Sequence, residues 1–124
     1  MKYEDFTKDM QTEIANKIQD CLKKLGIHTS VEISSRETKP YGKIWVNVKS
    51  DTFNTSPVMF KNVWIDGCGI VEKDEEYDGT YNLTIALHYR WETFSGGYNG
   101  TELATVTFRM CDNDDYVRFM GFAL

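Results

Sequence analysis

The sequence predicts an α+β domain in which one amphipathic helix packs on a curved antiparallel sheet of five or six strands. Apolar residues recur at mostly helical spacing over residues 3–25, whereas after Gly26 they alternate with a period of two. Short polar turns join the strand-like segments, which is typical of an antiparallel meander. Because 124 residues is the size of one domain, we expect a single domain over 1–124, with the helix at about 3–25 and the meander at about 29–123.

The helix is indicated by its apolar stripe and by both of its ends. The stripe consists of Phe6, Met10, Ile14, Ile18, Leu22 and Leu25. Acidic residues gather at the start and Lys23 and Lys24 lie at the end, as the helix dipole favours. Gly26 then allows the left-handed conformation that commonly follows a helix.

The first half of the sheet is predicted from three segments. A short strand covers 29–35, and the segment "KIWVNVKS" at 43–50 alternates cleanly between apolar and polar residues. Residues 58–71 are strand-like, but "DGCG" at 66–69 predicts a bulge or a sharp bend within them.

The second half begins with a charged connection over 72–79 that turns at Asp78-Gly79. The strongest strand, "LTIALHYRW", covers 83–91, and a further strand over 101–110 follows the glycine loop. The polar turn "DNDD" at 112–115 leads to a last strand at about 116–123.

The glycine-rich segment "WETFSGGYNGTEL" at 91–103 has strands on both sides and no helix or Gly-Lys-Ser/Thr after it. A phosphate cradle needs such a helix N-terminus or lysine behind its glycines. We therefore interpret the segment as a hairpin tip that turns at Asn99-Gly100, with Tyr98 and Phe94 as apolar contacts.

Charge and cysteine content narrow the classes of partner. With 19 acidic and 14 basic side chains the net charge is −5, which argues against direct nucleic-acid binding. The N-terminus has no apolar run and no segment approaches a membrane-spanning length, so neither a secretory signal nor a membrane helix is expected. An odd number of widely spaced cysteines indicates a reducing compartment, the cytoplasm.

Catalytic and metal-binding patterns are weak. Cys68, between two glycines, is the one candidate nucleophile, and either His28 or His88 would have to serve as its base. The alternative is a small buried thiol at a bulge. No paired Cys or His spacing predicts a zinc site, so no catalytic residue, cofactor or metal is assigned.

Two surfaces are candidates for binding a protein. One is the acidic run in the 72–79 connection, which would either bind a basic partner or simply form a charged turn exposed to solvent. The other is the sheet face opposite the helix, although large apolar residues on both faces leave open which face the helix covers. The candidate partner-binding residues are Trp45, Trp64, Glu72, Asp74, Glu75, Glu76, His88, Arg90, Tyr98 and Arg109.

These features favour a small acidic protein-binding module and not an enzyme. The specific hypothesis is an inhibitor that occludes a nucleic-acid-processing enzyme, of the kind that phages and mobile elements carry. One alternative is a small-molecule-binding protein or small enzyme with a pocket near Cys68 and His88. Another is a structural homodimer in which two copies bury their open sheet faces together.

Overall fold

A computed structural model describes residues 6–38, 43–53, 61–111 and 117–124. Within these residues one helix precedes six strands: α1 (Lys8–Lys24), β1 (Val31–Thr38), β2 (Lys43–Ser50), β3 (Lys61–Lys73), β4 (Thr80–Glu92), β5 (Tyr98–Cys111) and β6 (Arg118–Ala123). The strands form one sheet in the order β1-β2-β3-β4-β5-β6, and every neighbouring pair is antiparallel. The predicted α+β class, with one helix and an antiparallel sheet, is confirmed.

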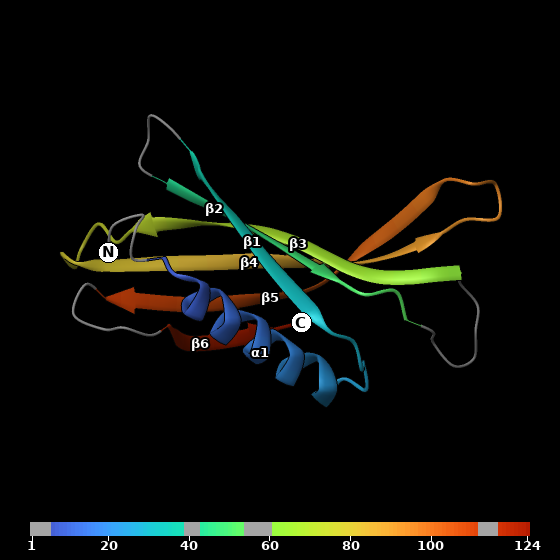
Figure 1. The fold of residues 1–124 in the computed structure, drawn as a ribbon, viewed down its shortest axis with the longest axis horizontal. Helices are drawn as coiled ribbons and strands as arrows, with labels where there is room; N and C mark the ends of the chain where they lie inside the picture. The colour runs from blue at the N-terminus through green and yellow to red at the C-terminus, as the bar shows by residue number, and fades with distance from the viewer. Residues whose placement is uncertain (1–5, 39–42, 54–60, 112–116) are drawn as a thin grey trace.

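Figure 1 shows α1 lying against the sheet, with β1 and β2 crossing the longer strands obliquely. The helix touches both edge strands. Gln19 Oε1 accepts a hydrogen bond of 2.9 Å from the backbone N–H of Val31 in β1. On the other side, Lys17 Nζ lies 5.3 Å from the centre of the Phe119 ring in β6.

The helix begins at Lys8, later than the sequence predicts, because Thr7 caps it. The Thr7 side chain accepts a hydrogen bond of 3.4 Å from the backbone N–H of Met10. At the other end Gly26 has a φ of 79° and its N–H donates to the Lys23 carbonyl, as the sequence predicted.

The core lies between the apolar stripe of α1 and one face of the sheet. Ile14, Ile18 and Leu22 of the helix are completely buried. The sheet residues packed with them are Val31, Ile44, Val46, Val48, Ile65, Val71, Leu83, Ile85, Leu87, Val106, Phe108 and Met110. Burial of each such side chain contributes about 1.5–3 kcal/mol to the free energy of folding, so the packing of α1 against the sheet is the main stabilising feature of the fold. The helix thus covers the face carrying Val46 and Ile85, and we call the opposite side of the sheet the open face.

The predicted bend at 66–69 is wrong, since β3 stays in regular register with β4 from Trp64 to Lys73. The irregularity lies earlier, between Lys61 and Trp64, where Asn62 has a φ of 47°. Gly67 and Gly69 serve close packing instead of a bend. A Cβ atom at Gly69 would lie 2.4 Å from the Thr84 carbonyl oxygen.

The predicted turn at Asn99-Gly100 is also wrong, because both residues lie inside β5 and pair with Trp91 and Arg90 of β4. The chain reverses at 93–97 instead. There the Thr93 N–H donates to the Gly97 carbonyl at 2.9 Å, and Gly96 supplies a φ of 86°. The predicted "DNDD" turn lies outside the described residues.

Candidate functional site

The pairing register brings residues from five strands together on the open face. One row runs across the sheet through Ser34, Asn47, Cys68, Ala86 and Thr105. The next row runs through Glu32, Lys49, Asp66, His88 and Glu102. Directly paired residues point to the same face of a sheet, so these polar side chains are neighbours.

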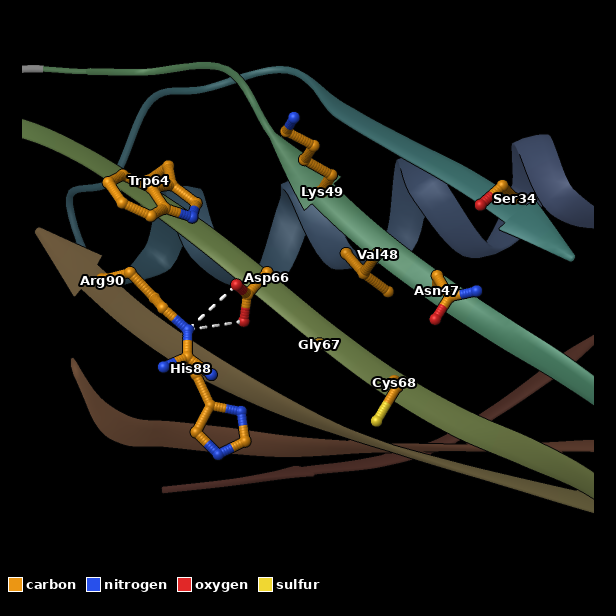
Figure 2. Close-up of a pocket in the computed structure, with 10 residues that line it drawn as sticks. All are labelled: Ser34, Asn47, Val48, Lys49, Trp64, Asp66, Gly67, Cys68, His88 and Arg90. Atoms are coloured by element: carbon orange, nitrogen blue, oxygen red, sulfur yellow. Dashed lines mark hydrogen bonds and ion pairs between the residues drawn. The ribbon is translucent and has the colours of Figure 1, made fainter. Parts of the chain in front are cut away.

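A groove of ≈ 620 Å³ crosses these rows (Figure 2). The residues that line it are Ser34, Asn47, Val48, Lys49, Trp64, Asp66, Gly67, Cys68, His88 and Arg90. Its volume is within the range of small-ligand sites.

An ion pair fixes one side of this groove. Arg90 Nε donates hydrogen bonds of 3.0 and 2.9 Å to the two carboxylate oxygens of Asp66 on the neighbouring strand. Both side chains are 38% exposed, so the pair adds little stability but sets the direction of the guanidinium group.

Beyond the groove, the β4–β5 hairpin carries exposed aromatic side chains. Phe94 at the turn is 99% exposed, and Tyr98 at the start of β5 is 69% exposed. The Tyr98 ring meets the Trp64 ring edge-on, with the centroids 5.4 Å apart. We call Trp64, Phe94 and Tyr98 the aromatic end of the open face.

The acidic connection between β3 and β4 is built around Asp74. Its Oδ1 accepts the backbone N–H groups of Glu76 and Tyr77, at 2.8 and 3.1 Å. Its Oδ2 accepts hydrogen bonds from the side chains of Asn82 at 2.7 Å and Arg109 at 3.3 Å. The hydrogen bond from Asn82, followed by that from the Glu76 N–H, lowers the pKa of Asp74 to about 2. Asp74 therefore holds the turn in shape.

Other charges of this connection also have partners within the chain. Glu72 pairs with Lys43 at 2.9 Å, and Asp78 pairs with Lys73 at 3.4 Å. Glu75 and Glu76 are exposed.

The structure divides the predicted binding residues into two groups. The acidic connection and the aromatic end lie at opposite ends of β4 (Figure 1), whose 13 residues span about 43 Å. Trp64, His88, Arg90 and Tyr98 lie together at the end of the sheet that carries the β4–β5 hairpin. Trp45, Glu72, Asp74, Glu75, Glu76 and Arg109 belong to the other half of the molecule.

This separation decides how the two groups can contact one partner. An interface of standard size buries about 800 Å² on each protein, a patch roughly 30 Å across. One compact interface therefore cannot be centred on both the acidic connection and the aromatic end.

Cys68 and His88 both line the groove, whereas His28 is an exposed residue between α1 and β1. Within the described ranges no hydrogen bond joins the Cys68 thiol to either imidazole. The thiol is exposed and not buried at a bulge, which corrects that alternative. Among the residues that the structure describes, no three His, Cys, Asp or Glu side chains gather in a way that could hold a metal ion.

The sequence did not single out Asp66, Asn47 or Lys49 as site residues. The alternation of apolar and polar residues places Asn47 and Lys49 on the same face as Trp45, and this pattern could have identified them as site residues. The contact between Asp66 and Arg90 joins residues 24 positions apart and depends on the register of β3 with β4. No local pattern reveals that register.

Comparison with protein-family models, with curated proteins and with solved structures finds no match to this chain. In the described part of the chain, no helix has the length and apolar character needed to cross a membrane.

Proposed function

We propose that this protein is a binding module for another protein and that the aromatic end of its open face is the anchor. The observation that carries the proposal is the exposure of Phe94, at 99%, and of Tyr98, at 69%, beside the partly exposed Trp64. Clustered aromatic side chains on a folded surface are typical of an interaction site.

Two contacts support this choice because they prepare the surface before binding. Tyr98 is held against Trp64, and Arg90 is held by Asp66. Side chains that are already ordered lose less conformational entropy when a partner arrives. Trp, Tyr and Arg are also the residue types most enriched at the centres of protein interfaces.

The shape of the sheet supports an occluding role. One helix reaches both edges of the sheet. On one side of α1, the side chains of Gln11 and Gln19 contact β1. On the other side, Glu13 contacts Val117 and Lys17 contacts Phe119. A flat sheet of six strands would hold its edges about 24 Å apart, roughly twice the helix diameter. We infer that the sheet curves around α1, which makes the open face its convex side, suited to enter a concave site on a partner.

The partner class that we propose is an enzyme that processes nucleic acid, whose basic groove the protein would occlude. Its net charge of −5 would attract such a groove at long range. Because most of the length of β4 separates the acidic connection from the aromatic end, its role would be to speed the encounter and not to anchor the complex. We further propose a cytoplasmic location, since Cys21, Cys68 and Cys111 are free thiols.

The test uses two tyrosines at opposite ends of the sheet. The wild-type protein, Tyr98→Ser and Tyr77→Ser are each immobilised and exposed to nuclease-treated extract of the source organism, and retained proteins are identified by mass spectrometry. Tyr77, in the acidic connection, is 58% exposed and serves as the matched control.

We expect one stoichiometric partner on the wild-type and Tyr77→Ser columns, with at least about 30-fold weaker binding to Tyr98→Ser. Equal retention by all three proteins would refute the aromatic anchor. Light scattering on the purified protein separates the proposal from the homodimer alternative, in which open faces of two copies cover each other.

A further inference from the structure

The groove on the open face is lined by two cationic side chains and one carboxylate, although the whole protein is acidic. The chain has a net charge of −5, yet the ionised side chains of the groove are Lys49 and Arg90 against Asp66 alone. Glu32 and Glu102 continue the same row just outside the groove, paired with Lys49 and with His88, so the groove offers cationic donors within an acidic surrounding.

The hydrogen bonds show which of these groups remain free. Within the described part of the chain, both hydrogen bonds that the Asp66 carboxylate accepts come from Arg90 Nε. Lys49 lies directly opposite Asp66 in the sheet register, but it forms no ion pair within the described part of the chain. The Lys49 ammonium and the terminal nitrogens of Arg90 are therefore hydrogen-bond donors left for a ligand.

The shape of the groove complements these donors. Trp64 forms an aromatic wall on one side, as Figure 2 shows, and Asn47 lies at the other side with a free amide. Val48 and Gly67 belong to the rows that face the helix, so they contribute backbone to the floor. A flat apolar body would rest against Trp64, while a negative group would reach the free cations.

We propose that this groove binds a small aromatic monocarboxylate. One carboxylate can be held by the two cationic donors, whereas a phosphate monoester carries about −1.5 to −2 charges at neutral pH and would be repelled more strongly by Asp66 and by the flanking Glu32 and Glu102. The Lys49 ammonium donates to the carboxylate, Arg90 contributes a second cationic donor, and Trp64 packs against the ring. This proposal does not require the protein partner proposed above, but the two ligands would share Trp64 and Arg90.

Benzoate is the probe, and its neutral isostere benzamide tests the charge. Each compound is titrated into the isotopically labelled protein while the amide signals of β2 and β3 and the indole signal of Trp64 are followed by NMR. The test variant is Lys49→Met, which keeps the length of the side chain and removes its charge. Lys23→Met is the matched control, because Lys23 is an exposed residue at the end of α1, on the covered side of the sheet.

We expect saturable benzoate binding with a Kd of about 1 mM or below, and binding of benzamide about tenfold weaker. Lys49→Met should weaken benzoate binding about tenfold, and Lys23→Met should leave it unchanged. An absence of saturation far above that concentration would overturn the proposal, as would equal affinities for the two probes or an unaltered affinity in Lys49→Met. Tyr98→Ser should still bind benzoate, so a failure of the protein-binding proposal is distinguishable from a failure of this one.

Discussion

Replacing Gly69 by alanine tests the packing of β3 against β4 at the centre of the sheet. An added Cβ atom would lie 2.4 Å from the Thr84 carbonyl oxygen, 3.0 Å from Leu83 Cδ1 and 3.1 Å from Ile85 Cγ1. The nearest atom belongs to the backbone of the paired strand, so relief requires the two strands to move apart. Overpacking of this kind costs about 1–3 kcal/mol, and we expect Gly69→Ala at the upper end of that range.

Gly121→Ala in β6 is the matched control. Its added Cβ would meet nothing nearer than Thr107 Oγ1, at 3.8 Å, which is an ordinary contact. This substitution should be neutral or stabilise the protein by about 0.4–1 kcal/mol, because alanine restricts the unfolded chain.

Urea denaturation followed by circular dichroism gives the free energy of unfolding for both variants. The melting temperature should fall by about 3–5 °C for each kcal/mol lost. Equal stability of Gly69→Ala and the wild type, or an equal loss in Gly121→Ala, would refute the packing assigned to β3.

Three further substitutions or treatments test other parts of the structure. Asp74 has its pKa lowered from an ordinary 3.8 to about 2, so it stabilises the fold above its unfolded pKa, and this contribution is lost as the pH falls through about 2. Asp74→Asn should therefore lower the free energy of unfolding at neutral pH and flatten its decline between about pH 4 and pH 2, measured by urea denaturation across that range. Ile18→Ala should cost about 2–5 kcal/mol in the same assay, because Ile18 is 0% exposed against the sheet. Native protein treated with iodoacetamide should be alkylated at the exposed Cys68 while the buried Cys21 reacts only after unfolding, as peptide mass spectrometry would show; alkylation of Cys21 at a similar rate would contradict the burial of α1 on the sheet.

Local patterns predicted the helix and β2 well because each depends on neighbours along the chain. The alternation over 43–50 coincides with β2 (Lys43–Ser50), and the position of Gly26 past the end of α1 followed from its conformational freedom. The start of the helix was predicted too early, because an apolar period does not reveal that Thr7 caps it.

The two wrong turns have a common physical cause. Asn99-Gly100 is a favourable hairpin pair, but Gly96 nearby also supplies a positive φ, and the pairing of β4 with β5 decides between the two positions. The glycines flanking Cys68 suggested a bend, yet their role is to avoid a collision with the backbone of the next strand. Neither outcome can be read from dipeptide preferences.

The candidate site was predictable only in part. Alternation identified Trp45, His88 and Arg90 as residues of one face, and Figure 2 shows His88 and Arg90 lining the groove. The distance between the acidic connection and the aromatic end depends on the length and direction of β4, so the sequence could not show that the predicted contacts form two separate groups.

The central claim is that a partner binds at the aromatic end of the open face. Hydrogen–deuterium exchange of the protein, alone and in complex with the captured partner, tests it most directly. We predict slowed exchange around Trp64 and in the β4–β5 hairpin over 88–102, with little change in α1 and in the acidic connection over 74–79. Protection confined to α1 or to the acidic connection, with the hairpin exchanging as in the free protein, would contradict the account.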